Sequence, residues 1–370
     1  MLNNAKRIVI KIGSSLLIDE RSGLREAWLL TLAEDVAALR RAGKQVAIVT
    51  SGAVALGRNP LGYDARALTL EEKQAAAACG QIALFSFWAQ ALAIVSLYPA
   101  QILLTADDSI NRRRYLNART TLEMLLASNR VIPVINENDT VATAELRFGD
   151  NDRLSARVAQ MISADCLVLF SDIDGLYAAD PRRNPAARFI EKVEAVTPEI
   201  EAMAAGAGSH IGTGGMATKL EAAKIALASG CHMAIASGME MHPLTRLQEN
   251  ARATWFIAAE SPKRARKRWI AGGLHPAGVL TVDAGAAEAL RSGKSLLPAG
   301  VTAVEGSFER GDAVLIKDAD GHIMGKGLSA YNAADALRII GRKSAELEGI
   351  LGFKGRATLI HRDDMVIDKN

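Results

Sequence analysis

The sequence predicts an α/β fold, in which a mostly parallel sheet lies between helices and a small β-rich domain follows at the C-terminal end. Short apolar runs recur along the chain with helical patterns between them, and this alternation is typical of βαβ units with parallel strands. The runs cover residues 7–12, 45–50, 101–104, 131–136, 166–171 and 232–236. Beyond Gly278 the pattern changes to short β runs and turns. A length of 370 residues also fits two domains.

The segment between the first two runs predicts an amphipathic helix. Leu29, Leu32, Val36 and Leu39 recur at helical spacing and would share one face. Gly43 follows, and glycine commonly ends a helix because it adopts the left-handed conformation without strain. We expect this helix to connect two neighbouring parallel strands.

Polar turns follow four of the predicted strands. They cover residues 13–15, 50–53, 136–139 and 171–175. In open parallel sheets, ligands bind beyond the carboxyl ends of the strands, and these turns lie at those ends. The sequence therefore predicts an active site along this edge of the sheet.

The apolar pattern is interrupted near Glu260. Residues 260–273 contain the run KRARKR and predict a linker or a basic strand. The following part predicts short strands, a polar helix over 333–342 and a last strand over 356–361. We expect a catalytic domain over 1–260, a basic linker over 261–277 and a β-rich domain over 278–370, which are ordinary domain sizes.

The charge distribution favours an enzyme that acts on small molecules. The net charge is +3, and the KRARKR run alone carries five positive charges, so the rest of the chain is close to neutral. An extended face for nucleic acid would require a larger basic excess.

Cysteines and histidines indicate neither a disulfide framework nor a metal site. The three cysteines, Cys79, Cys166 and Cys231, are far apart, which favours a reducing, cytoplasmic location. The histidines show neither metal-ligand spacing nor a pairing with serine, which argues against metalloprotease and hydrolase chemistry. We expect neither a signal peptide nor a stretch of 18 apolar residues that could span a membrane.

Lys11 lies inside a predicted buried strand, where an unpaired ammonium group would be costly. A glycine turn follows two residues later, so the ammonium could meet a phosphate held by the backbone N–H groups of that turn. The alternative is a lysine near a strand end whose ammonium reaches solvent.

Residues 211–230 predict a second phosphate-binding element. Three glycines and Thr213 precede an amphipathic helix that contains Lys219. Helix N-termini and exposed backbone N–H groups bind anions. The spacing differs from that of a P-loop, and an ordinary helix entry is the alternative.

Other polar segments exceed what local structure requires. Asp150, Asn151 and Asp152 stand where a loop enters a helix, although a helix cap needs only one of them. Residues 135–141 and 171–182 could equally form plain turns. In the functional interpretation, the acidic groups would accept hydrogen bonds from a substrate ammonium and orient a catalytic lysine.

Together, six motifs resemble the amino acid kinase family. They are VIKIGSSLL, IVTSGAVALG, INENDTV, FGDNDRLSA, SDIDGLYAADPR and GTGGMATKLEAA. The resemblance covers residues 6–258, and the tail is similar to a PUA domain. Among members of this family, such a tail is typical of those that use ATP and Mg²⁺ to phosphorylate the γ-carboxylate of L-glutamate. The resemblance therefore implies formation of γ-glutamyl phosphate, the first step of proline biosynthesis.

The resemblance also implies roles for individual residues. Contacts to ATP fall on Lys11, Ser171, Asp172, Thr213, Gly214, Gly215, Met216, Ala217, Thr218 and Lys219. Contacts to glutamate fall on Ser51, Asp139 and Asn151, with Asp150 close by. Lys11 and Lys219 would contact the transferring phosphoryl group, and Asp152 would hold both lysines. The turns at Gly13 and Gly52 would supply backbone donors, and no side chain is assigned as a metal ligand.

Partners follow from the same resemblance. It implies feedback inhibition by proline, an oligomer of identical chains with a tetramer as one candidate, and γ-glutamyl phosphate reductase as a transient partner. One alternative is a related kinase whose substrate is aspartate, acetylglutamate, carbamate or a nucleoside monophosphate. Another is an RNA-binding protein that acts through the PUA-like domain, although we do not expect binding to RNA or to a membrane.

Overall fold

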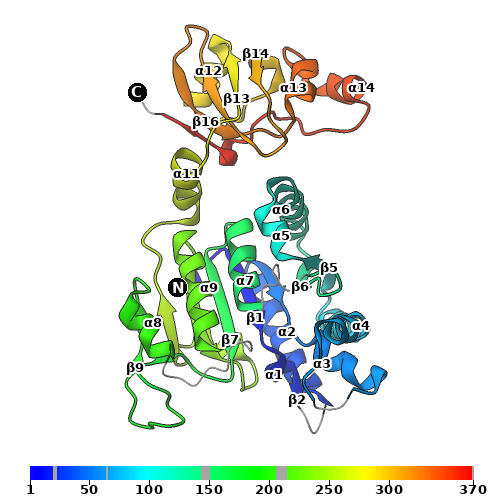
Figure 1. Ribbon diagram of the computed structural model, residues 1–370, viewed down its shortest axis with the longest axis vertical. Helices are drawn as coiled ribbons and strands as arrows, with labels where there is room; N and C mark the ends of the chain where they lie inside the picture. The colour runs from blue at the N-terminus through cyan, green and yellow to red at the C-terminus, as the bar shows by residue number, and fades with distance from the viewer. Residues whose placement is uncertain (20–22, 64–65, 143–150, 206–214, 369–370) are drawn as a thin grey trace. The chain divides into compact units, whose positions relative to one another are not determined.

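The chain forms two compact units in the computed structural model (Figure 1). The structure describes residues 1–19, 23–63, 66–142, 151–205 and 215–368. The first unit comprises residues 1–110 and 117–262, and the second comprises residues 111–116 and 263–370.

An eight-stranded sheet lies at the centre of the first unit, as far as the described residues show. From one edge to the other, its strands are β10 (Lys192–Val193), β12 (Ala253–Phe256), β11 (His232–Ser237), β7 (Cys166–Ser171), β1 (Arg7–Ile12), β4 (Gln45–Val49), β6 (Val131–Glu137) and β5 (Tyr98–Leu104). Neighbouring strands are parallel except β11 and β12. The predicted parallel sheet and its six predicted strands are confirmed. The sequence did not predict β10 and β12, because runs of two and four residues are too short to show a period.

The side chains of strand β1 point alternately to the two faces of the sheet. Ile8, Ile10 and Ile12 pack in the core cluster that also contains the buried face of helix α2 (Glu26–Arg41). Successive side chains of a strand point to opposite faces, so Lys11 points to the other face. Helix α7 (Asn151–Met161) contacts β1, and helix α9 (Met216–Ala228) packs beside α7.

Helix α2 follows the sequence prediction closely. Leu29, Leu32, Val36 and Leu39 are all buried in the core. Gly43 has φ +76°, the left-handed conformation expected just beyond a helix end.

Short elements complete the first unit. Apart from α4 (Leu70–Ile94), the other described α-helices up to residue 248 are α1 (Ser14–Leu17), α3 (Ala53–Arg58), α5 (Ala106–Ile110), α6 (Arg112–Ala127), α8 (Pro198–Ala205) and α10 (Pro243–Gln248), and the first residues of α6, up to Leu116, belong to the second unit. Two small antiparallel pairs are formed by β2 (Ile18–Asp19) with β3 (Gly23–Leu24), and by β8 (Leu176–Tyr177) with β9 (Phe189–Ile190).

Helix α4 (Leu70–Ile94) begins at a capping box. Thr69 Oγ1 accepts a hydrogen bond from the Glu72 backbone N–H, and the Glu72 carboxylate accepts one from the Thr69 N–H. By length and composition alone, α4 could cross a membrane, which corrects the expectation that no such segment exists. One face of this helix, which includes Leu84 and Trp88, is nevertheless buried in the core of the first unit.

The second unit is rich in β-structure, as predicted. Its five-stranded sheet has the order β14 (Val301–Gly306), β13 (Gly278–Val282), β15 (Ala313–Lys317), β16 (Ile323–Leu328) and β17 (Met365–Ile367). The described helices of four or more residues are α11 (Pro262–Gly272), α12 (Ala284–Arg291), α13 (Ala333–Ile339) and α14 (Leu347–Leu351). Only β13 and β15 pair in parallel.

Three details of the C-terminal prediction are wrong. The KRARKR segment, predicted as a linker or a basic strand, is helical and forms α11: Pro262 occupies the first helical position, Ala265 and Ile270 are buried, and Arg266 pairs with Asp364 at 2.6 Å. The predicted last strand over 356–361 contributes only an isolated bridge, because its apolar residues fill the core, and the last strand lies at 365–367. The helix predicted over 333–342 ends at residue 339.

Candidate active site

Two lysines converge on one buried aspartate in the first unit. Lys11 Nζ lies 2.5 Å from Asp152 Oδ1, and Lys219 Nζ lies 3.1 Å from Asp152 Oδ2. Exposure is 6 % for Lys11, 4 % for Lys219 and 0 % for Asp152. Thr218 Oγ1 donates a further hydrogen bond to Asp152 Oδ2 at 3.1 Å. Charges buried this deeply are stable only when they are paired and hydrogen-bonded.

Three elements bring these side chains together. Lys11 extends from β1 towards the face of the sheet that α7 covers, Asp152 is the second residue of α7, and Lys219 lies in the first turns of α9. Since α7 packs on both β1 and α9, the aspartate lies between the two lysines. The structure therefore supports the predicted convergence of positions 11, 152 and 219.

The electrostatics of Asp152 favour its charged form. Burial by itself would raise the pKa of this carboxyl, but the charges and hydrogen bonds of Lys11 and Lys219 outweigh burial and hold its pKa below the usual range. Asp152 is therefore an anion at neutral pH. Both of its oxygens contact ammonium groups, so its geometry is that of an anchor for the lysines.

Asn151, next to Asp152, connects two of the predicted polar turns, those over 50–53 and 136–139. Its two Nδ2–H groups have three acceptors within hydrogen-bond distance, which are Thr50 O at 2.5 Å, Ser51 Oγ at 3.0 Å and Asn136 Oδ1 at 2.8 Å. The ends of β4 and β6 and the start of α7 are thus connected by one side-chain amide. No individual role was predicted for Asn136, although it stands at the end of an apolar run, where a polar turn begins.

The turns at Gly13 and Gly52 differ in whether the backbone conformation requires glycine. Gly52 has φ +113° and precedes α3, so this position favours glycine for conformational reasons. Gly13 has φ −73°, which any residue can adopt, and a Cβ there would lie 3.9 Å from Lys11 Nζ. Glycine at 13 thus leaves space beside the Lys11 ammonium.

Ser171 ends β7, the neighbour of β1 in the sheet, and Asp172 follows directly after it. Ser171 Oγ donates to Asp172 Oδ1 at 3.0 Å, and Arg182 Nη2 lies 2.6 Å from Asp172 Oδ2. Partial burial would raise the pKa of Asp172, but hydrogen bonds and the Arg182 charge outweigh it and lower the pKa. The pair forms a polar edge to the site.

The remaining predicted residues are placed as follows. Gly215 precedes α9, which begins at Met216 and Ala217, and Gly215 O, 2.8 Å from Thr218 Oγ1, shares the single hydroxyl proton of Thr218 with Asp152. Asp139 lies in the turn after β6 and lines a pocket of about 390 Å³. Asp150, Thr213 and Gly214 lie outside the described residues.

The chemistry of this donor set fits a nucleotide phosphate. Two ammonium groups lie beside the N-terminus of α9, whose backbone N–H groups favour anions. Asp152 is already engaged by both lysines, so it is poorly placed to ligate a metal ion. Any Mg²⁺ that accompanies the nucleotide would be held mainly by the phosphates.

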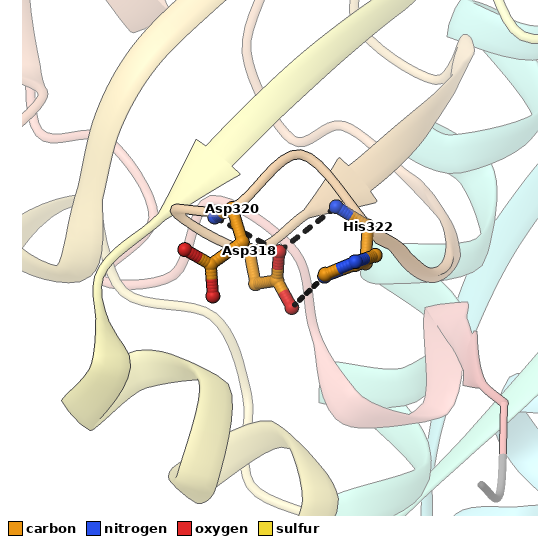
Figure 2. Close-up of side chains that lie close together, drawn as sticks. All are labelled: Asp318, Asp320 and His322. Carbon is orange, nitrogen blue, oxygen red and sulfur yellow. Dashed lines mark hydrogen bonds and ion pairs between the residues drawn. The ribbon is translucent and has the colours of Figure 1, made fainter.

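A cluster that resembles a metal site lies in the second unit. Figure 2 shows Asp318, Asp320 and His322 together in the turn between β15 and β16. Asp318 Oδ1 accepts hydrogen bonds from the backbone N–H groups of Asp320 at 3.1 Å and His322 at 2.9 Å. The Asp318 carboxylate therefore stabilises this turn, and we assign the cluster that local role.

The cysteines take no part in the site. All three are free thiols, and burial raises the pKa of Cys166 to about 12 and also raises the pKa of Cys231. These two remain protonated at neutral pH. The expectation of no disulfide framework is confirmed.

Two lysines share one buried carboxylate at the carboxyl edge of a parallel sheet, and this arrangement is typical of enzymes that act on phosphate groups. Comparison with known sequences identifies the family. Residues 6–237 match the profile of the Amino acid kinase family, and residues 278–351 match that of the PUA domain. The chain belongs to the amino acid kinase family.

Curated relatives cover nearly the whole chain. "Glutamate 5-kinase" of Paramagnetospirillum magneticum is 61% identical over 365 residues, which are 98% of this chain and 98% of that protein. "Glutamate 5-kinase 1" of Rhizobium meliloti is 57% identical over 366 residues, which are 99% of this chain and 93% of that protein. A solved carbamate kinase from Giardia lamblia bound to AMP-PNP aligns with TM-score 0.48 at 17% identity, over 70% of this chain and 100% of that one. The expected family and its two kinds of domain are confirmed.

Proposed function

We propose that this chain catalyses the reaction of the glutamate 5-kinases. ATP phosphorylates the γ-carboxylate of L-glutamate, which yields γ-glutamyl phosphate and ADP in the first step of proline biosynthesis. The observation that supports the chemistry best is the buried pairing of Lys11 and Lys219 with Asp152. The relatives of the same name support the choice of substrate.

The nucleophile requires no general base. A free γ-carboxyl has a pKa of about 4.3, so it is ionised at neutral pH. The difficulty is electrostatic, because an anionic carboxylate must approach an anionic phosphate. Preorganised positive charge is the main means of catalysing such a transfer. Nζ of Lys11 and Nζ of Lys219 would supply that charge at the transferring phosphoryl oxygens.

Asp152 would act as a positioning residue. It fixes both ammonium groups before any substrate arrives, so little reorganisation is needed when charge develops. Gly13, Gly52 and the N-terminus of α9 would add backbone N–H donors. Bound ATP would supply the phosphoryl group, Mg²⁺ would offset part of its negative charge, and Ser171 and Asp172 would contact the nucleotide.

Glutamate would bind on the other side of the transferring group. We assign its contacts to Ser51, Asp139, Asp150 and Asn151. The two carboxylates suit the substrate ammonium, and the side-chain oxygen of Asn151 suits the same group because its Nδ2 is engaged by the protein.

Regulation, assembly and location follow from the same assignment. We propose feedback inhibition by proline, an oligomer of identical chains, transfer of the labile product to γ-glutamyl phosphate reductase, and a cytoplasmic location. We also propose that residues 1–260 form the catalytic domain, 261–277 a basic connection and 278–370 the PUA-like domain.

The test is an assay of the full chain for γ-glutamyl hydroxamate formation from glutamate, ATP and hydroxylamine, with ADP release as a second readout. Glutamate should support turnover, EDTA should abolish it, Mg²⁺ should restore it, and proline should inhibit it. A panel of aspartate, acetylglutamate, carbamate and nucleoside monophosphates separates the related kinases. A higher kcat/KM for any of these would overturn the choice of glutamate.

A further inference from the structure

The orientation of the Asn151 amide is fixed by the protein before any ligand binds. Its Nδ2 has three acceptors, which are Thr50 O, Ser51 Oγ and Asn136 Oδ1. Two of these acceptor residues, Thr50 and Asn136, are almost completely buried. With its N–H groups directed at them, Asn151 presents its carbonyl oxygen as the atom that can accept a hydrogen bond from a substrate ammonium.

Helix α4 holds both of these buried acceptor residues. Asn136 Nδ2 donates to Gln81 Oε1 at 2.8 Å, and Trp88 Nε1 donates to Thr50 Oγ1 at 3.0 Å. Gln81 and Trp88 are seven residues apart on α4, which is about two helical turns, so they lie on the same side of the helix.

The hydrogen bond between Asn136 and Gln81 constrains the orientation of the Asn136 amide as well as its position. Asn136 Oδ1 accepts from Asn151, so the other end of the Asn136 amide must donate. Gln81 therefore has to offer an acceptor. Rotation of Asn136 or Gln81 by half a turn would place donor against donor, and rotation of Asn151 would place acceptor against acceptor, so the acceptor at Gln81 reinforces the orientation that Thr50 O sets for the Asn151 amide.

Helix α4 is suited to this role because its own place is closely fixed. A Cβ at Gly80 would lie 1.8 Å from Ala53 O, and a Cβ at Gly57 would lie 1.7 Å from Ala76 O. Helices α3 and α4 therefore touch through their backbones at these glycines. Gly80 directly precedes Gln81, and α3 directly follows the Ser51–Gly52 turn, so the contact sets the glutamine against the polar turns of the site.

We propose that Gln81 and Trp88 are positioning residues for substrate binding, acting through Asn136 and Thr50 on the amide of Asn151. The inference rests on the proposed contact between Asn151 and glutamate. It assigns to α4, a helix without any of the expected site residues, the task of keeping the Asn151 carbonyl oxygen directed at the amino group of the substrate.

The main test compares Gln81→Met with Gln81→Glu in the full chain. Methionine has a similar length but a poor acceptor, so the glutamate KM should rise about fivefold, the factor that corresponds to one neutral hydrogen bond. The kcat and the ATP KM should differ from the wild-type values by less than about twofold, since the lost hydrogen bond does not contact ATP. Glutamate at position 81 keeps an acceptor for Asn136 Nδ2, so this variant should recover most of the affinity.

Matched controls isolate the connection. Gln90→Met changes another glutamine of α4, whose Nε2 bonds only to Ser86 Oγ among the interactions of the described residues, and it should leave all kinetic constants unchanged. Trp88→Phe removes only the N–H donor to Thr50 and a part of the ring, and it should raise the glutamate KM without changing the ATP KM. It also provides a test if Gln81→Met folds poorly, which thermal unfolding would reveal.

A double-mutant cycle separates failure of this inference from failure of the proposed site. If Asn151→Ala leaves the glutamate KM unchanged, the substrate role of Asn151 is wrong, and the inference falls with it. If Asn151→Ala raises this KM, Gln81→Met should raise it in the wild-type background and add nothing in the Asn151→Ala background. Additive effects, or a wild-type KM for Gln81→Met, would overturn the positioning role alone.

Discussion

Replacing Asp152 with asparagine should destabilise the first unit and suppress catalysis together. The two lysine ammonium groups lie 2.5 and 3.1 Å from the two oxygens of one fully buried carboxylate. An amide has nearly the same shape, but it must direct its NH₂ group at one of the ammonium groups. It also removes the negative charge that compensates both of them.

The size of the effect follows from the depth of burial. Removing one partner from a buried ion pair costs about 3 to 5 kcal/mol, since a charge is left uncompensated in a medium of low polarity. In a domain of this size, about 1 kcal/mol corresponds to roughly 2 to 4 °C in Tm, so we expect a fall of roughly 6 to 20 °C. The kcat should fall roughly 100-fold or more, as after loss of other preorganised electrostatic groups.

Thermal unfolding and steady-state kinetics of the same preparation check this expectation. Glu194→Gln is the matched control, because Glu194 pairs with Lys192 at 2.6 Å on the exposed surface, and its Tm should not change. ATP should raise the Tm of Asp152→Asn more than that of the wild type, since its phosphates would replace part of the lost negative charge. A variant with wild-type Tm and kcat would refute the idea that Asp152 holds the two lysines.

Three further predictions concern the same region. Lys219→Ala should lower kcat far more than it weakens glutamate binding, whereas Asn151→Ala should mainly raise the glutamate KM; equal effects of both changes on both constants would contradict the separate roles. Gly80→Ala should lower stability to chemical denaturation by at least about 1 to 3 kcal/mol, because its new Cβ would overlap Ala53 O, 1.8 Å away, and an unchanged midpoint would refute the close helix contact. The folded pKa of Asp152 lies below its unfolded value, so its stabilising effect is complete above the unfolded value of about 3.9 and is lost as pH falls through the folded pKa. The stability gap between wild type and Asp152→Asn should therefore narrow in acid, and a gap independent of pH would count against this.

Much of the first unit was predictable because buried parallel strands are continuous apolar runs. Arg7–Ile12 and Cys166–Ser171 are such runs, and both are strands with the predicted bounds. Strand β10 escaped prediction because its two residues carry no period. The segment of α11 was misjudged because its basic residues masked a helical repeat that only the burial of Ala265 and Ile270 reveals.

The sequence indicated which residues belong to the site, but it did not indicate the hydrogen bonds that connect them. Glycine turns and polar residues after strands indicated Lys11, Asn151 and Lys219, since each stands where a chain turn meets an apolar run. Gln81 could not be found in this way. It lies in the middle of an apolar helix, and its relevance appears only when the fold places it 2.8 Å from Asn136.

The position of β1 in the sheet has a consequence for how the chain folds during synthesis. Its neighbours are β4, made soon afterwards, and β7, which begins at Cys166. At about 5 to 20 residues per second, a ribosome needs on the order of 10 to 30 s to make the chain between β1 and β7. One edge of a strongly apolar strand thus stays without its neighbour for that time, and the ammonium of Lys11 stays hydrated until the helix that carries Asp152 has been made. The nascent kinase domain is therefore a candidate client for chaperones that shield unpaired strands until translation has passed the middle of the gene.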